Sequence, residues 1–562
     1  MFGGSVSCAR SLSRPGPPDR PGCDRYTLAV PSSDRNEFAA LIERLRNDHP
    51  GGPLVVPVGV RLLSDQLTPV LAYRRLVAPD ERTAPSFLLE SVVGGERQGR
   101  HSLLGAHPIV EVAVRLGRCD ITDNRTGKTV TTTEPDPLGV LKALYADHVF
   151  HRPTDTSLPG CVLGGWFGFA AYDTVRYAEP GKLGFDTAPP DDRGLPDLHF
   201  GYYDRVVVFD HVDKLVHVVR LIEVAPGDDP GARYDEAISD IDDLVAQLET
   251  HSKPLPAGLV GRADPETDRA PMASNITEAQ HREMVERAKE YIRAGDIFQV
   301  VVGQRFERRS LADPFDVYRA LRAVNPSPYM VYLQAPGCIL IASSPEILCR
   351  CRQTPGGALA VTNRPLAGTR RRGETGAEDL ALERELLADD KERAEHVMLV
   401  DLGRNDVGRV ADLGSVRLER TMEIERYSHV MHISSTVTGE LRPGCDAWDA
   451  LRAALPVGTV SGAPKVRAMQ IIDELEPVRR GPYGGGLGYV GLDGQMDIAL
   501  ALRTVVVPTA MRDPATGEWI YQIQAAGGIV ADSQPALEFA ETVNKAAALA
   551  RAIELAESAL TS

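Results

Sequence analysis

The sequence of 562 residues lacks several features that would place a chain of this size in a common class. It has no uninterrupted apolar run of about 18 residues, so we expect no membrane-spanning helix. Its eight cysteines are scattered, without the paired spacing of a zinc site, which favours reduced thiols. The net charge of −16 argues against a nucleic-acid partner, because such partners select for a basic surface.

Two glycine-rich segments also fail to qualify as nucleotide-binding motifs. Residues 458–465 resemble a phosphate loop but lack its Lys-Ser/Thr ending. Residues 486–491 fit the glycine spacing of dinucleotide-binding folds, yet a turn and a second strand pattern follow where a helix is required. We therefore predict a β-hairpin around 486–491.

The N-terminal residues 1–35 differ in composition from the rest. They are rich in Pro, Gly, Ser and Arg and lack the apolar segment of a secretory signal. A disordered extension or a misassigned start is favoured, and an organellar transit peptide is the alternative. We expect a cytoplasmic protein.

From residue 36 onward the pattern is that of a globular α+β protein. Residues 36–250 contain amphipathic helix patterns at 38–45 and 233–249, with Val- and Leu-rich strand patterns between them. Residues 251–272 are proline-rich and without periodicity, as in a linker. Residues 273–562 mix helices and strands without a regular βαβ alternation. We predict two lobes of layered antiparallel sheets with flanking helices.

Two helical segments each carry a Glu-x-x-Glu step. Glu392 and Glu395 lie in one, and Glu538 and Glu541 lie in the other. Residues three apart share a helix face, so each helix can direct two carboxylates the same way. Four converging carboxylates need a cation, and oxygen ligands suit Mg²⁺. The alternative is that both pairs are solvated helix faces.

Several motifs, in the same order, resemble those of the chorismate-utilising enzymes, most closely the large components of anthranilate synthases. The motifs are LLADDKERAEHVMLVDLGRNDVGRV (386–410), IERYSHVMHISSTVTG (424–439), GTVSGAPK (458–465), YGGGLGY (483–489), NPSPYM (325–330), FLLES (87–91) and GGWFGFAAYD (164–173). The resemblance implies conversion of chorismate and ammonia to anthranilate and pyruvate, the first committed step of tryptophan synthesis. It also implies a regulatory lobe at 36–250 and a chorismate-binding catalytic domain at 273–562.

The resemblance implies a partner and a metal. Ammonia would come from glutamine through a glutamine amidotransferase subunit, because this chain shows no amidotransferase cysteine motif and no His-x-Glu pair. Glu395 and Glu541 would coordinate Mg²⁺, with Glu392 and Glu538 supporting it largely through water.

The same resemblance assigns roles in the site. Glu346 would be the general acid at the C4 oxygen of chorismate. His432 would assist loss of pyruvate, with a structural strand histidine as the alternative. The implied substrate-binding residues are Gln299, Gly368, Thr369, Thr459, Tyr483, Arg503, Gly527, Gly528 and Lys545. Ala526 stands where family members commonly have Gly, which would alter how closely the backbone approaches the substrate.

Two positions separate the relatives. Water-adding members have a lysine base where this chain has Gln299, and ammonia needs no such base. Many aminodeoxychorismate synthases have a nucleophilic lysine where this chain has Ala367. Both residues favour anthranilate as the product. A component of aminodeoxychorismate synthase, or a phenazine-type synthase that retains pyruvate, are the alternatives.

A tryptophan-binding feedback site is also implied. Its residues would be Glu90, Ser91, Arg100, Pro328, Tyr329, Met330, Leu487 and Tyr489. The alternative is that these segments are merely packed strands.

Overall fold

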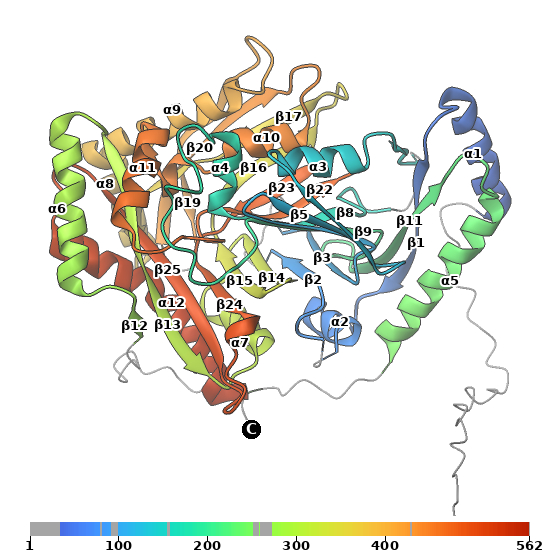
Figure 1. Ribbon diagram of the computed structural model, residues 1–562, viewed down its shortest axis with the longest axis horizontal. Helices are drawn as coiled ribbons and strands as arrows, with labels where there is room; N and C mark the ends of the chain where they lie inside the picture. The colour runs from blue at the N-terminus through green and yellow to red at the C-terminus, as the bar shows by residue number, and fades with distance from the viewer. Residues whose placement is uncertain are drawn as a thin grey trace, which may run out of the picture.

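The protein is an α+β structure built on two large sheets, as predicted (Figure 1). The computed structural model describes residues 34–78, 81–91, 99–153, 158–250, 258, 272–427 and 430–560. The predicted extension and the predicted linker fall almost wholly outside these residues.

The first sheet has 13 strands, mostly antiparallel. In chain order they are β1 (Leu54–Leu63), β2 (Ser86–Glu90), β3 (His101–Ala106), β7 (Val149–Phe150), β10 (Arg205–Asp210), β11 (Leu215–Val224), β12 (Ala273–Ser274), β13 (Gln299–Ser310), β14 (Tyr329–Ala335), β15 (Cys338–Ser344), β21 (Gly462–Ala463), β24 (Thr504–Pro508) and β25 (Trp519–Ile529).

The second sheet has 12 strands. They are β4 (Val110–Arg115), β5 (Arg118–Asp123), β6 (Lys128–Thr133), β8 (Gly165–Ala170), β9 (Leu198–Tyr203), β16 (Ile347–Gln353), β17 (Leu359–Asn363), β18 (Leu366–Arg371), β19 (Arg417–Arg426), β20 (Val430–Glu440), β22 (Gly486–Gly491) and β23 (Met496–Leu500). The hairpin β22–β23 confirms the prediction for 486–491.

Helices flank both sheets (Figure 1). They are α1 (Arg35–Asp48), α2 (Pro69–Leu76), α3 (Pro137–Leu144), α4 (Val175–Ala178), α5 (Pro230–Glu249), α6 (Glu278–Ala294), α7 (Pro314–Val324), α8 (Gly376–Ala388), α9 (Asp390–Gly408), α10 (Ala447–Ala454), α11 (Lys465–Leu475) and α12 (Pro535–Leu560). Short 3₁₀ turns lie at Tyr172–Thr174, at η2 (Gly458–Val460) and at Thr509–Met511. No helix in the described ranges is long and apolar enough to cross a membrane.

Local sequence explains where the helices begin and end. A capping box between Thr277 and Gln280 starts α6, and Gly295, with φ of 82°, ends it. Both Glu-x-x-Glu segments are helical, in α9 and α12, as predicted.

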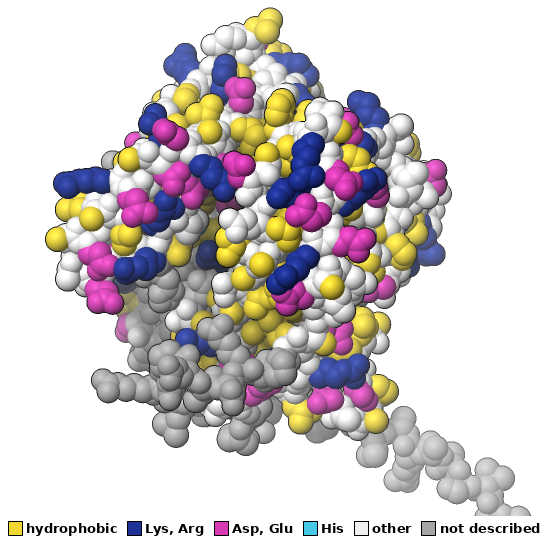
Figure 2. Space-filling model, turned by 90° about the vertical axis from the view of Figure 1, so that its left-hand side faces the viewer, with side chains coloured by type: hydrophobic (Ala, Val, Ile, Leu, Met, Phe, Trp, Pro, Cys, Tyr) yellow, Lys and Arg dark blue, Asp and Glu magenta, His cyan; other side chains and the backbone are white. Residues whose placement is uncertain are grey.

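The core lies between the sheets and joins the two halves of the chain. Phe87 in β2 stacks on Phe167 in β8, with ring centroids 3.9 Å apart. Strand β2 pairs with β14, and β8 pairs with β22, so each sheet takes strands from both sides of residues 251–272. On the face over α6 and α11, basic and acidic side chains are interspersed (Figure 2).

Candidate active site

The four glutamates of α9 and α12 approach two glycine-rich strand segments. A Cβ added to Gly527 would lie 3.2 Å from Oε2 of Glu538 and 3.9 Å from Oε1 of Glu541. A Cβ added to Gly528 would lie 3.8 Å from Oε1 of Glu395. The helices therefore bring carboxylates from distant parts of the sequence to the end of β25, where the glycines leave room for them.

The fourth carboxylate lies against β18. Oε2 of Glu392 would be 3.2 Å from a Cβ on Gly368, whose φ of 69° favours glycine. Arg370 donates to Oε1 of Glu392 at 3.2 Å. Sequence reasoning missed Arg370, although it follows the predicted residues Gly368 and Thr369 directly.

The other carboxylates are also engaged. Gln299 donates from Nε2 to Oε1 of Glu395 at 3.0 Å. Lys545 lies 2.6 Å from Oε1 of Glu541 and donates to the carbonyl of Ala526 at 2.8 Å. As they stand, no three Asp, Glu, His or Cys side chains of the described residues are placed to share a metal ion.

The oxygen atoms of the four glutamates are nevertheless the kind of ligand that a hard cation prefers. Burial, and the charges of Glu392 and Glu541, raise the pKa of Glu395. Burial and the charge of Glu541 likewise raise the pKa of Glu538. Crowded carboxylates of this kind are stabilised by a divalent cation, and oxygen ligands are those that Mg²⁺ prefers.

Glu346 lies between β15 and β16 and is only 4% exposed. Thr459, in η2, donates from Oγ1 to Oε1 of Glu346 at 3.0 Å. Burial raises the pKa of Glu346 to about 8, against the opposing effect of the Thr459 hydrogen bond. The side chain is therefore protonated at neutral pH, as a general acid must be.

His432, in β20, is held in one tautomer. Its Nδ1 lies 3.0 Å from the carbonyl oxygen of Gly368 and 3.1 Å from Oγ1 of Thr369. A carbonyl can only accept, so Nδ1 carries the proton and Nε2 is left as a base. Burial lowers the pKa of His432 to about 4, which keeps the ring neutral.

Arg503 precedes β24 and is a half-buried cation. Burial lowers its pKa, and no described carboxylate offsets that loss. A half-buried guanidinium with no carboxylate partner among the described residues favours an anionic ligand, and a carboxylate can be bound through two parallel hydrogen bonds.

Tyr483 and Ala526 pack together with Val301. A Cβ on Gly303 would lie 2.7 Å from the Ala526 methyl, so this methyl packs against the neighbouring strand β13. Ala526 is 4% exposed, so its methyl group is buried in the core.

All the predicted effector residues line one cavity of about 360 Å³ between the halves of the chain. The buried carboxylate of Glu90 accepts from Nε of Arg322 at 3.0 Å, and Oγ of Ser91 is buried without a hydrogen-bond partner among the described residues. The cavity also contains residues that sequence reasoning missed: Arg350, Arg352, Arg364 and Asp497. Arg350 and Arg352 both donate to Oδ2 of Asp497, at 3.0 and 3.1 Å. No sequence motif separated these residues from ordinary strand positions.

The chain resembles known proteins over most of its length. The family of chorismate binding enzymes matches residues 96–551. The chain is 52% identical to "Anthranilate synthase alpha subunit 1, chloroplastic" of Arabidopsis thaliana, over 90% of this chain and 86% of that protein. It is 41% identical to "Anthranilate synthase component 1" of Acetivibrio thermocellus, over 89% and 95%. A crystal structure of anthranilate synthase component I from Streptococcus pneumoniae superposes with a TM-score of 0.65 and 33% identity, covering 87% of this chain and 99% of that one.

Proposed function

The chain belongs to the chorismate-binding enzyme family, and we propose that it acts as the large subunit of an anthranilate synthase. It would convert chorismate and ammonia to anthranilate and pyruvate. One observation carries the proposal beyond family membership: Glu346 is buried against the Thr459 hydroxyl, and Nδ1 of His432 faces the Gly368 carbonyl, which leaves Nε2 as the basic nitrogen. Burial raises the pKa of Glu346 and lowers the pKa of His432. The first residue can give a proton to a leaving oxygen, and the second can take a proton from carbon.

Each side chain then has a defined task. Arg503 binds a carboxylate of chorismate. Ammonia forms a bond to C2 while the C4–oxygen bond breaks, and Glu346 supplies the proton that turns the departing hydroxyl into water. The new ammonium group then loses one proton, which restores the proton on Glu346. Nε2 of His432 then removes the proton from C2, the C3–oxygen bond breaks, and the released enol becomes pyruvate. Gln299 is bound to Glu395 and supplies no base, and ammonia requires none.

Mg²⁺ is the second proposal. We infer that Glu395 and Glu541 hold it, with Glu392 and Glu538 contacting it through water. When bound, it would neutralise the ring carboxylate of chorismate and orient the ring. Gln299 and Lys545 occupy two of these carboxylates here, at 3.0 and 2.6 Å.

The proposal also includes a partner subunit, an effector and a cellular location. A glutamine amidotransferase subunit supplies the ammonia, and the chain acts in the cytoplasm. Tryptophan fills the cavity of about 360 Å³, where the buried carboxylate of Glu90 and Oγ of Ser91 suit its ammonium group.

The test is incubation of the purified chain with chorismate, Mg²⁺ and a high concentration of ammonium at a pH just below 8, where Glu346 keeps its proton, with the products separated. We expect anthranilate, detected by its fluorescence, and pyruvate. A 4-amino product alone would make the chain an aminodeoxychorismate synthase component. An aminated product that retains pyruvate would make it a phenazine-type synthase.

A further inference from the structure

Behind the candidate active site, a buried ion pair connects separate segments of the chain. Glu476 follows α11, and Arg480 lies in the turn after it. Their side chains are 3% and 1% exposed. Arg480 donates from Nε and Nη2 to the two carboxylate oxygens of Glu476, at 2.9 and 2.6 Å. The pair is thus a buried contact made through two hydrogen bonds.

Arg480 also holds two segments that carry predicted chorismate-binding residues. Its Nη1 donates to the carbonyl of Val460 at 2.6 Å, next to Thr459. Its Nη2 donates to the carbonyl of Val301 at 2.7 Å, two residues after Gln299. The position of the Thr459 hydroxyl, and through it of Glu346, therefore depends on this guanidinium.

Glu476 holds β13 and β25 together from the same side. Its Oε1 accepts from the backbone N–H of Gly303 at 2.9 Å, and its Oε2 accepts from Nε2 of Gln524 at 3.3 Å. Gln524 lies three residues before Gly527. The carboxylate therefore helps set the end of β25, against which the metal-site glutamates pack.

The guanidinium also lies between two rings. It is 4.8 Å from the ring centroid of Tyr172 and 5.9 Å from that of Tyr483. Tyr483 follows Arg480 by three residues, so the same group fixes both the turn and the face of the tyrosine that it carries.

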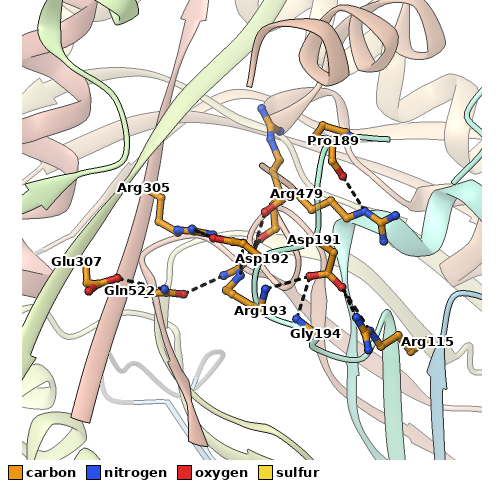
Figure 3. Close-up of polar contacts among 11 residues, drawn as sticks. Arg115, Pro189, Asp191, Asp192, Arg193, Gly194, Arg305, Glu307, Arg479 and Gln522 are labelled. Atoms are coloured by element: carbon orange, nitrogen blue, oxygen red, sulfur yellow. Dashed lines mark hydrogen bonds and ion pairs between the residues drawn. The ribbon is translucent and has the colours of Figure 1, made fainter. Parts of the chain in front are cut away.

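The loop that contains Arg193 also contacts this turn (Figure 3). Arg193 donates to the carbonyls of Arg479 and Arg480 at 3.0 and 2.8 Å. Its neighbour Asp192 accepts from Arg305 in β13 at 3.1 Å. The turn that contains Arg480 is therefore held by Arg193 as well as by the ion pair.

We propose that Glu476 and Arg480 are positioning residues that set Thr459, Tyr483 and the end of β25 for chorismate binding. The inference rests on the proposed function and names residues outside the substrate contacts. A buried ion pair seldom stabilises a fold more than an apolar pair would. We infer that this pair sets the geometry of the segments around it rather than adding stability. These segments are η2, β13, β25 and the turn that leads to Tyr483.

The experiment compares Arg480→Lys and Glu476→Gln with Arg82→Lys in the otherwise intact chain. Arg82 is 6% exposed and pairs at 2.9 Å with Asp313, the residue that caps α7, so it is a buried arginine in an ion pair of another element. Melting temperature, kcat and KM per folded molecule, and chorismate affinity by calorimetry are measured for each. We expect the first two variants to lose about tenfold to hundredfold in kcat/KM and to bind chorismate more weakly. Arg82→Lys should melt earlier and retain both values.

A double-mutant cycle separates positioning from general weakening. Adding Arg480→Lys to Thr459→Val should cost much less activity than adding it to the wild type, because both changes disturb one hydrogen bond. Effects of Arg82→Lys and Thr459→Val should simply multiply. Multiplying effects of Arg480→Lys and Thr459→Val would overturn the inference, as would unchanged kcat and KM in Arg480→Lys and Glu476→Gln.

Failure of the positioning role and failure of the proposed function give different experimental results. A wild-type chain that forms no anthranilate refutes that function, while the chorismate affinities of the variants still decide the positioning role. If Arg480→Lys does not fold, Gln524→Leu removes only the hydrogen bond of 3.3 Å and should weaken chorismate binding severalfold. Unchanged affinity in that variant would overturn the inference.

Discussion

Replacement of Glu346 by Gln tests both the chemistry and the electrostatics of the site. Gln keeps the shape and can accept the hydrogen bond from Thr459, but it cannot give a proton. Loss of a positioned general acid typically costs about 10²- to 10⁴-fold in rate. Ionisation of Glu346 near pH 8 should also make wild-type turnover fall on the alkaline side. Anthranilate fluorescence across pH measures both effects.

The same substitution has a stability consequence whose sign follows from the raised pKa. Its value is about 8 in the folded state, against 4.5 for the free side chain, so the folded state holds the proton more tightly between these limits. The contribution to stability is complete below about pH 4.5 and is lost as pH rises to about 8. At about 1.4 kcal/mol per pH unit, the loss is on the order of 5 kcal/mol.

The assay is urea unfolding of wild type and Glu346→Gln at pH 5 and pH 8.5. Subtracting one protein from the other cancels the titration of all other groups. The wild type should lose several kcal/mol more than the variant between the two pH values. Equal losses would refute the raised pKa, and undiminished turnover in Glu346→Gln would refute its role as the acid. Glu440→Gln, at an exposed position, is the control and should change neither result.

Three further predictions concern the metal, the partner and the effector. Glu395→Gln or Glu541→Gln should abolish turnover and Mg²⁺ binding measured by calorimetry, and full activity in excess chelator would rule out the metal. The purified chain should use ammonium but not glutamine until an amidotransferase subunit is added; glutamine-dependent turnover by the chain alone would contradict this. Tryptophan should change the apparent chorismate affinity by about 5- to 150-fold. Ser91→Ala or Met330→Thr should weaken that inhibition while uninhibited turnover persists, and unchanged kinetics at saturating tryptophan would exclude the effector site.

Periodicity in the sequence was sufficient for the individual elements. The helical spacing around Glu392 and Glu538 predicted α9 and α12, and the Val- and Leu-rich run after residue 53 predicted β1. The strand pairing was not predictable in this way. Pairing of β2 with β14 joins residues more than two hundred positions apart, and no local pattern encodes such a partner.

The residues of the candidate active site were likewise only partly predictable from the sequence. Motifs identified the residues that carry reactive groups, but not the side chains that hold them. In the sequence, Arg480 is one of two adjacent arginines. Arginine side chains are usually exposed, so the sequence alone predicts an exposed position for it. Its burial follows from Glu476 four residues earlier and from the carbonyls of Val301 and Val460, which only the fold brings together.

The segment around Glu346 gives the proposed feedback a physical basis. Pro345 and Ile347 line the cavity that we assign to tryptophan. Glu346, between them, is directed to Thr459 instead. A ligand that fills the cavity therefore contacts both neighbours of the acid without touching the acid itself. If the cavity binds its ligand more tightly in one arrangement of this segment than in another, the free-energy difference is transmitted to the carboxyl group. The two sites are then coupled through one strand connection, and inhibition needs no contact between tryptophan and chorismate.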